Sequence, residues 1–254
     1  MKLAAALDLQ PGEVVALVGG GGKTSVMFLL AREMVEAGTL VLSTTTTHIF
    51  ASQIRQAPAH LLDTDAQPER LRAMLAAHRH VLVTGPTNPA TARAAGLSLE
   101  RLRELRTWCP EACVLDEADG SRTRPFKAPA DHEPVIPRET TLVVAVVGAD
   151  ALGRPLAPEH VHRPERVSAL SGAAPDSPVT PELVARVLTH PEGGRKGVPP
   201  GARLVVLINK MDAVADPTPA RELAELLLRE PTVHAVALAA VRRPDPVLEV
   251  CRRR

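Results

Sequence analysis

Short runs of Val and Leu recur along the chain and are separated by stretches with a helical spacing of apolar residues. Continuous apolar runs are typical of strands that are buried on both faces of a parallel sheet. We predict strands at 14–18, 40–43, 80–83, 112–116, 142–147, 204–208 and 233–238. We predict helices at 25–37, 67–78, 98–106, 181–189 and 218–229. This alternation indicates an α/β fold, a doubly wound and mainly parallel sheet of about seven strands.

Two long segments, 120–140 and 150–180, interrupt this pattern because they are polar, contain several prolines and have no regular period. Loops of this length in a compact domain usually carry function or are disordered. The chain has 254 residues, a length that fits one large α/β domain or two small ones. We expect residues 1–254 to form a single domain in which both segments are functional loops.

The first predicted strand runs directly into a glycine loop that is followed by a predicted helix. Glycine allows consecutive backbone N–H groups to turn toward an anion, and the helix N-terminus favours negative charge. A lysine after the glycines neutralises phosphates, and a threonine hydroxyl can bind Mg²⁺. The residues expected to bind nucleotide phosphates are Gly19, Gly20, Gly21, Gly22, Lys23, Thr24 and Ser25. The sequence therefore predicts a P-loop nucleotide-binding domain.

The glycine loop is shorter than the usual P-loop pattern, which would need a glycine in place of Leu17. The form G-x-x-G-K-T resembles the loop of Mur-type ligases. It is also similar to the loop of the dimerising MinD/CooC-like NTPases, although Val18 replaces their signature lysine. An ATP-dependent ligase or kinase of Mur-like type is thus an alternative to a nucleotide hydrolase, and a non-hydrolysing nucleotide-binding module is another. The oligomeric state stays open.

Polar residues follow the second and fourth predicted strands, at the sheet edge where α/β proteins bind ligands. Four threonines precede His48, and the hydroxyl of Thr45 suits a metal or a terminal phosphate, although such a run is also typical of an extended sheet edge. His48 is a candidate proton carrier. The fourth strand ends in Asp116, Glu117 and Asp119, and carboxylates there hold Mg²⁺ or orient a nucleophile.

Strand alternation places Glu117 and Asp119 on one face and Asp116 on the other. We favour the first two as metal-side groups and keep Asp116 as a competitor. The expected catalytic residues are Lys23, Glu117, Asp119 and His48. The candidate metal ligands are Thr24, Thr45, Asp116, Glu117 and Asp119.

The sixth predicted strand is followed by Asn209, Lys210, Met211 and Asp212. The pattern Asn-Lys-x-Asp at a strand end is typical of the guanine-reading loop of GTPases. Its aspartate accepts hydrogen bonds from the guanine N1–H and exocyclic amine, which adenine does not offer in that arrangement. A site built on such hydrogen bonds discriminates strongly between bases. We therefore expect a Mg²⁺-dependent nucleotide-binding protein, with GTP favoured over ATP as its nucleotide.

Composition removes several other classes of partner. Aromatic residues make up only 2% of the chain and tyrosine is absent, which argues against stacking on single-stranded nucleic acid. The net charge of +1 implies no polyanionic partner such as nucleic acid. No apolar run is long enough to cross a membrane, and three cysteines do not form a disulfide framework. We expect a cytoplasmic protein with no nucleic-acid or membrane partner.

The polar segments carry charged side chains directly after the acidic strand end. An anionic second substrate or a protein partner could contact them, or the segments are exposed loops without a ligand. The candidates are Arg122, Lys127, His132, Glu133, His162 and Arg163.

Taken together, several motifs resemble the YqeC family. They are Val18–Thr24, Thr44–His48, Glu117–Gly120, Lys127–Pro137, Val147–Gly153, His160–Glu165 and Asn209–Asp212. The resemblance covers most of the chain, and the segment 127–137 is very specific. It implies an accessory protein for the maturation of selenium-dependent molybdenum hydroxylases, assigned to selenium cofactor biosynthesis. The partner that it implies is such a hydroxylase or its cofactor.

Overall fold

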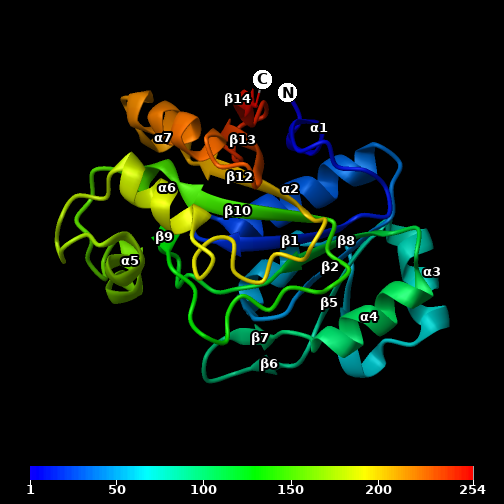
Figure 1. Ribbon diagram of the computed structural model, residues 1–254. Helices are drawn as coiled ribbons and strands as arrows, with labels where there is room; N and C mark the ends of the chain where they lie inside the picture. The colour runs from blue at the N-terminus through cyan, green and yellow to red at the C-terminus, as the bar shows by residue number, and fades with distance from the viewer. Residues whose placement is uncertain (254) are drawn as a thin grey trace.

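The protein is described by a computed structural model that covers residues 1–253. A nine-stranded sheet runs through it in the order β14-β13-β12-β10-β1-β8-β2-β5-β4 (Figure 1). Its strands are β1 (Val14–Gly19), β2 (Val41–Thr45), β4 (His60–Leu62), β5 (His80–Thr84), β8 (Cys113–Glu117), β10 (Leu142–Gly148), β12 (Arg203–Asn209), β13 (Val233–Ala239) and β14 (Val247–Arg252). Every pairing is parallel except that of β13 with β14.

The α/β fold and all seven predicted strands are confirmed, and the sheet gains the two edge strands β4 and β14. These two were not predicted because β4 has only three residues and β14 has a single buried residue, so neither shows a buried run. The helices are α1 (Leu3–Ala6), α2 (Lys23–Glu36), α3 (Pro68–His78), α4 (Leu99–Trp108), α5 (Pro164–Ser171), α6 (Pro181–Thr189) and α7 (Thr218–Leu228). Of these, α1 and α5 were not predicted.

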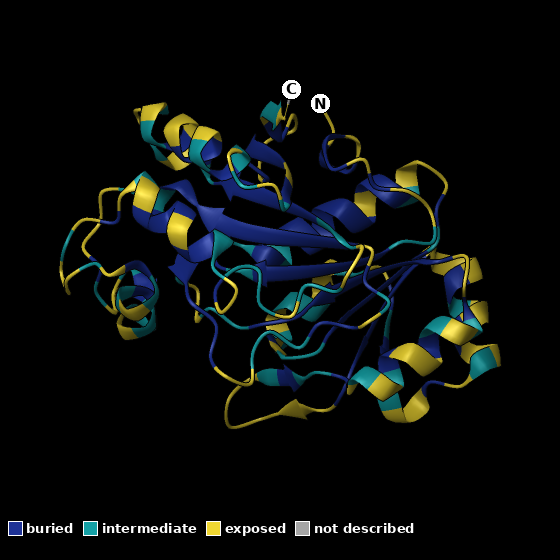
Figure 2. Cartoon of the chain, viewed as in Figure 1, coloured by how far each residue is buried: buried dark blue, intermediate teal, exposed yellow. Residues whose placement is uncertain are grey.

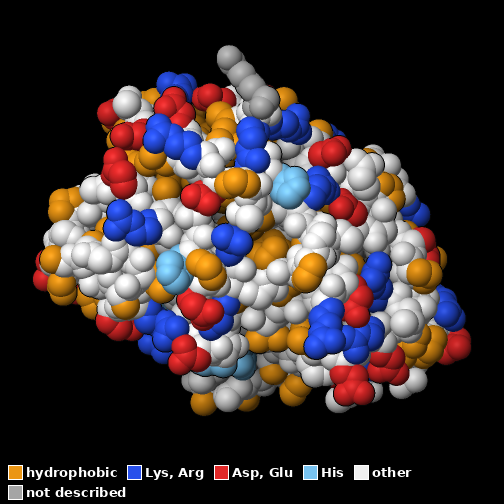
Figure 3. All heavy atoms as spheres, in the orientation of Figure 1, with side chains coloured by type: hydrophobic (Ala, Val, Ile, Leu, Met, Phe, Trp, Pro, Cys, Tyr) orange, Lys and Arg blue, Asp and Glu red, His pale blue; other side chains and the backbone are white. Residues whose placement is uncertain are grey.

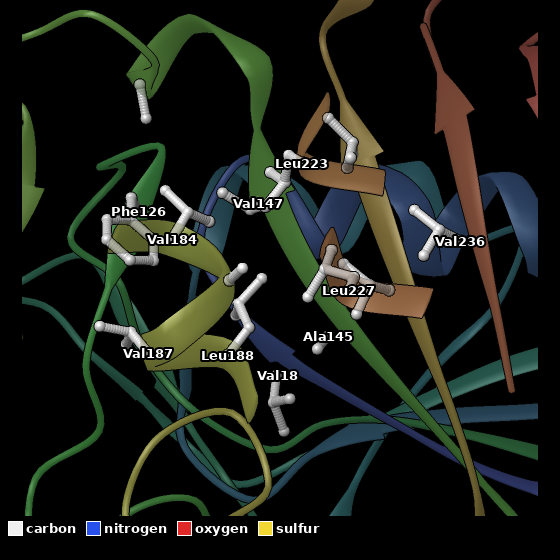
Figure 4. Close-up of a cluster of buried hydrophobic side chains, with 14 of the residues drawn as sticks. Val18, Phe126, Ala145, Val147, Val184, Val187, Leu188, Leu223, Leu227 and Val236 are labelled. Atoms are coloured by element: carbon white, nitrogen blue, oxygen red, sulfur yellow. The ribbon is translucent and has the colours of Figure 1, made fainter. Parts of the chain in front are cut away.

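Helices cover both faces of the sheet. Val15 and Leu17 of β1 pack with α1 and α2 on one face, whereas Ala16 and Val18 pack with α6 and α7 on the other. Val14 lies two residues before Ala16 and therefore points to the same face of the sheet as Ala16 and Val18. Its cluster contains residues of α3 and α4, so these helices cover the same face as α6 and α7. Figure 2 shows the resulting buried strands beneath helices with exposed outer stripes. Figure 4 shows side chains of α6 and α7 gathered over the sheet.

The two long polar segments contain regular structure. Their strands β9 (Phe126–Lys127) and β11 (Val161–His162) pair in parallel, and α5 follows directly. The side chain of Phe126 is only 1% exposed and belongs to the cluster beneath α6 (Figure 4). The segments therefore extend the core rather than lying outside it as loops alone.

A small antiparallel sheet lies outside the main one. It consists of β3 (His48–Phe50), β6 (Thr87–Asn88) and β7 (Arg93–Ala95), in the order β3-β7-β6. Short 3₁₀ turns occupy η1 (Ala51–Gln56), η2 (Asp63–Asp65), η3 (Ala149–Ala151) and η4 (Met211–Ala213). Because β3 follows β2 and β7 follows β5, this sheet stands beside the carboxyl ends of the parallel strands.

The face of the molecule seen in Figure 3 carries no dominant charge. Figure 3 shows acidic and basic side chains intermixed on the face in view, in keeping with the net charge of +1. Within residues 1–253, no helix combines the length and the apolar character needed to cross a membrane.

Candidate functional site

Close backbone approach explains why the loop between β1 and α2 consists of glycines. Gly19, Gly21 and Gly22 have φ values of +92°, +77° and +111°, which residues with a Cβ rarely adopt. A Cβ on Gly19 or Gly21 would collide with the backbone of β10, and one on Gly20 would lie 2.7 Å from the carbonyl oxygen of Arg124. Substitution at any of these positions would push the loop away from its neighbours.

The loop leaves backbone donors available at the start of α2. The N–H groups of Gly20 and Gly21 donate to the carbonyl oxygens of Val146 and Arg124 at 2.8 and 3.1 Å. By contrast, the amides of residues 22–25 have no hydrogen-bond partner in the part of the chain that the structure describes. Free amides at the N-terminus of a 14-residue helix form an anion-binding site.

Lys23 lies folded back over this loop. Its side chain is 2% exposed, and its Nζ donates to the carbonyl oxygen of Gly19 at 2.6 Å. The same Nζ lies 3.2 Å from Oδ1 of Asp119 and 3.8 Å from Oε1 of Glu117. The structure thus brings the lysine of the loop together with Glu117, the last residue of β8, and with Asp119, which lies just after it.

Thr24 and Glu117 form the pair that could hold a metal. Thr24 Oγ1 donates to Glu117 Oε2 at 2.6 Å, and Thr45 Oγ1 donates to the backbone carbonyl of Glu117 at 2.8 Å. Burial raises the pKa of Glu117, while Lys23 and Thr24 oppose that shift. A hydroxyl beside a carboxylate at a helix N-terminus is a donor set that fits Mg²⁺, with positions left for further oxygen ligands. Among residues 1–253, no three His, Cys, Asp or Glu side chains could hold an ion by themselves.

Asp116 lies apart from this pair. It shares a strand face with Val114, which packs in the cluster of α3 and α4, whereas Leu115 packs with α2. Thr46 Oγ1 donates to Asp116 Oδ2 at 3.0 Å, and the buried Oδ1 has no protein partner within residues 1–253. Burial raises the pKa of Asp116 to about 8. The structure therefore places this carboxyl on the sheet face opposite to α2.

Asn209 ties three segments together at the end of β12. Its Nδ2 donates to the carbonyl oxygen of Gly21 at 2.8 Å, and its Oδ1 accepts from the amide of Val241 at 3.2 Å. Lys210 has a φ of +62° and its Nζ lies 2.8 Å from Oδ2 of Asp150. Asp212 is exposed on η4. The Asn-Lys-x-Asp segment is thus fixed against the glycine loop, with its aspartate open to solvent.

A cavity of about 250 Å³ is lined by Lys23, Thr24, Glu117 and Lys210, among other residues. Its walls come from the glycine loop, the end of β8, the small sheet and the loops after β12 and β13. The lining residues are Gly22, Lys23, Thr24, Ser25, His48, Phe50, Gln53, Arg93, Glu117, Gly120, Ser121, Arg122, Thr123, Lys210 and Arg242. The sequence pattern pointed to neither Arg93 nor Arg242, since only the fold brings them to the glycine loop.

A chain of charges leads from this cavity into the polar segments. Lys127 is 3% exposed, and its Nζ contacts the carbonyl oxygen of Gly120 at 2.6 Å, Glu133 Oε2 at 2.6 Å and Asp119 Oδ2 at 3.0 Å. Arg163 completes the chain at 2.7 Å from Glu133. We name Lys23, Asp119, Lys127, Glu133 and Arg163 the charge network. The ammonium of Lys127 has all three of its protons engaged inside the protein, so it offers none to a second substrate in this conformation.

The other candidates in the polar segments differ in exposure. Arg122 and His132 are exposed, and Arg122 lines the cavity. Burial and the neighbouring Arg163 lower the pKa of His162 to about 4, so its ring is neutral at physiological pH. The side chains of Arg122 and His132 are therefore available for contact with a ligand, whereas His162 is an uncharged residue near the charge network.

The fold and the loop define an α/β protein with a glycine-rich anion site at the edge of a mainly parallel sheet. The model of the family described as YqeC protein matches residues 15–165. The Escherichia coli (strain K12) protein "Uncharacterized protein YqeC" is 32% identical over 238 residues, covering 90% of this chain and 88% of that protein. The chain belongs to the YqeC family, as its motifs indicate.

Solved structures overlap with the chain more loosely. FtsY from Mycoplasma mycoides is 13% identical with a TM-score of 0.43, and covers 98% of this chain and 66% of its own. The signal recognition particle receptor FtsY from Elizabethkingia anophelis is 12% identical with a TM-score of 0.38, over 92% of this chain and 63% of its own. The chain spans just under two thirds of the length of these structures. At such low identity and TM-score, the similarity says nothing about what this chain binds or catalyses.

Replacing Lys127 by methionine tests whether the charge network stabilises the fold. We expect Lys127→Met to lower the free energy of unfolding by about 3–5 kcal/mol, because it leaves Asp119 and Glu133 buried with fewer partners. Urea denaturation measures this. The matched control is Lys2→Met, which breaks an ion pair of the same 2.6 Å length at an exposed site and should change the free energy of unfolding far less, because solvent screens the exposed pair. Equal effects of the two substitutions would show that burial is unimportant here.

The stability of the protein should fall on acidification through Glu133. Burial alone would raise the pKa of this carboxyl, but Arg163 and Lys127 outweigh it and lower the pKa to about 2. The stabilisation is therefore present above the unfolded pKa near 4.5 and is lost as the pH falls toward 2. We expect the stability gap between wild type and Glu133→Gln to narrow by about 1–2 kcal/mol between pH 6 and pH 3. A gap that stays constant in urea titrations would contradict this assignment.

Proposed function

We propose that the protein is a Mg²⁺-dependent nucleotide hydrolase that binds GTP in preference to ATP. One observation carries the proposal: Gly22, Lys23 and the Thr24–Glu117 pair line the same cavity as Lys210 of the Asn-Lys-x-Asp segment, and Asn209 of that segment donates a hydrogen bond to the glycine loop. This combination matches what a nucleoside triphosphate requires, namely amide donors, a cation and metal ligands at one end and a base-reading segment at the other.

The phosphates would bind at the N-terminus of α2. The amides of residues 22–25 would donate to phosphate oxygens, and Lys23 would leave Gly19 and Asp119 to contact the outer phosphates. Thr24 and Glu117 would hold Mg²⁺, and a bound ion there would neutralise phosphate charge as the reaction proceeds. Asp119 would keep the Gly19 amide, whose N–H lies 3.0 Å from its Oδ1, and so retain the shape of the loop.

In hydrolysis, a water oxygen forms a bond to the terminal phosphorus while the bond between that phosphorus and the diphosphate oxygen breaks. His48 lines the cavity and is exposed, so it is placed to take the proton that the attacking water loses. Thr45 would act through the carbonyl of Glu117, which it contacts, rather than through a direct metal bond.

The wider role that we propose is an accessory function in maturing selenium-dependent molybdenum hydroxylases, in the cytoplasm. Membership of the YqeC family supports it through the resemblance described above. The exposed side chains of Arg122 and His132 would contact the hydroxylase or its cofactor.

A Mur-like ligase or kinase is the second candidate, favoured by the short form of the glycine loop. The two are separated by product analysis: a hydrolase releases phosphate from GTP alone, whereas a ligase or kinase turns over only with an acceptor. A non-hydrolysing module would bind nucleotide, gain thermal stability and release no phosphate in either assay.

Lys23→Ala should weaken binding of Mg²⁺ with a non-hydrolysable GTP analogue by about 100-fold or more, because charged hydrogen bonds to two phosphates are lost. Isothermal titration calorimetry measures the affinity, and circular dichroism checks that the variant folds. Lys2→Ala removes an exposed lysine that pairs with Glu36 and does not line the cavity, and this variant should bind as wild type does. Unchanged affinity in Lys23→Ala would remove the phosphate assignment.

Asp212→Asn should reduce the preference for GTP over ATP analogues by about 10-fold or more, since the asparagine cannot accept both guanine donors. Affinity for the ATP analogue should stay the same. The control is Asp176→Asn, a substitution at an exposed aspartate in the segment before α6. If GTP affinity survives Asp212→Asn, the base is read elsewhere.

A further inference from the structure

The small sheet is held firmly against the end of β2. The amide of Leu97, just after β7, donates to the carbonyl oxygen of Thr45 at 2.8 Å, and the amide of Gly85 donates to Ala95 at 2.9 Å. A Cβ on Gly96 would collide with the backbone of residues 45–47, so β7 approaches β2 as closely as glycine permits. Thr45 in turn contacts the carbonyl of Glu117. The small sheet therefore has a fixed position relative to the Thr24–Glu117 pair.

Arg93 projects from this sheet into the cavity. It pairs with Phe50 across β3 and β7, and its guanidinium carbon lies 4.8 Å above the centroid of the Phe50 ring. Both residues line the cavity together with Lys23, Thr24 and Glu117. No carboxylate within residues 1–253 forms an ion pair with Arg93, and the side chain makes no hydrogen bond to that part of the protein. A half-buried guanidinium that is ordered by an aromatic ring but lacks an anion is prepared for an external one.

The order of the strands indicates which part of a nucleotide Arg93 would meet. β12 lies on one side of β1, and β8 and β2 lie on the other. The Asn-Lys-x-Asp segment follows β12, whereas the small sheet adjoins β2. A nucleotide whose base lies beyond β12 and whose phosphates lie at α2 has its terminal phosphate directed toward β2 and the small sheet.

We propose that Arg93 is a catalytic residue that binds the terminal phosphate of the nucleotide, held in place by the ring of Phe50. This inference rests on the proposed function and adds the residue that stabilises its transition state. As the water–phosphorus bond forms and the bond to the diphosphate breaks, the electron pair of the broken bond stays on the diphosphate. Arg93 would neutralise charge on the terminal phosphate oxygens and transfer no proton, a role that an arginine within the same chain fills in other nucleotide hydrolases.

Arg122 and Arg242 also line the cavity but lack this support. Both are exposed residues outside helices and strands, and neither stacks on an aromatic ring within residues 1–253. Positioning by a ring and by a strand pair reduces the entropy that a side chain loses when it binds an anion. The same anion therefore gains more from Arg93 than from the other two.

The experiment compares Mg²⁺ complexes of GDP and of a non-hydrolysable GTP analogue by calorimetry. We expect Arg93→Ala to weaken binding of the analogue by about 10-fold and to leave GDP affinity within about 2-fold, since only the terminal phosphate loses a contact. The kcat for phosphate release should fall by about 10³-fold. Arg93→Lys should recover only part of both losses, because it keeps the charge but not the planar fork.

Two further variants complete the test. Phe50→Leu leaves the charge of Arg93 but removes its stacking partner, and should reduce kcat while changing GDP affinity little. Arg55→Ala is the matched control, since Arg55 is an exposed arginine on η1 that does not line the cavity. Urea denaturation of each variant checks its fold, and Arg93→Gln replaces Arg93→Ala if the latter does not fold.

The results separate the failure of this inference from that of the proposed function. If wild type binds GDP and the analogue but Arg93→Ala keeps the same ratio of affinities and the same kcat, Arg93 does not contact the terminal phosphate. If neither wild type nor Lys23→Ala binds GDP or the analogue, both the proposed function and this inference are wrong. If Arg55→Ala also reduced the ratio of GTP-analogue affinity to GDP affinity, the assignment would be overturned, because the effect would then follow the total charge of the protein rather than the position of Arg93.

Discussion

The carboxylate of Asp119 is the interaction on which the rest of the site depends. Its two oxygens lie 3.0 and 3.1 Å from the amide of Gly19, and it pairs with Lys23 at 3.2 Å and Lys127 at 3.0 Å while only 2% exposed. A buried carboxylate is stable only if such donors compensate for its lost hydration. The end of β8, the glycine loop and β9 must therefore keep their relative positions, or all of these charges become uncompensated together.

Strong local signals made much of the fold predictable. Strands buried on both faces must be continuously apolar, so seven strands could be read from the sequence. Glycine has no alternative at Gly19 and Gly21, where a Cβ would collide with the backbone of β10. The edge strand β14 could not be read in the same way, since one of its sides faces solvent and its residues follow no buried run. The helix α5 is short and lies within a segment dominated by polar residues, so its period is weak.

Site residues could be predicted where they lie at the ends of apolar strands. They could not be predicted where their position depends on the pairing of short strands that are distant in sequence. Glu117 and Asp119 could be placed beside the glycine loop because alternation along β8 fixes their face. Arg93 carries no such signal, since its position depends on strands of two and three residues that are too short to show a period. Lys127 illustrates a different limit: the sequence of a polar segment looks the same whether its lysine is exposed or is buried among carboxylates.

The charge network also determines what a bound nucleotide would need. Its cations Lys23, Lys127 and Arg163 face its carboxylates Asp119 and Glu133 and also the neighbouring Glu117. These positive and negative groups offset one another before any ligand enters. A triphosphate that draws Lys23 toward itself takes that charge from the acidic residues rather than adding to the total. New positive charge must then come from a metal ion beside Thr24 and from guanidinium groups that have no partner. In the proposed function, electrostatic balance would therefore require both a cation and the guanidinium of Arg93 in the same site, whichever base is bound at the other end.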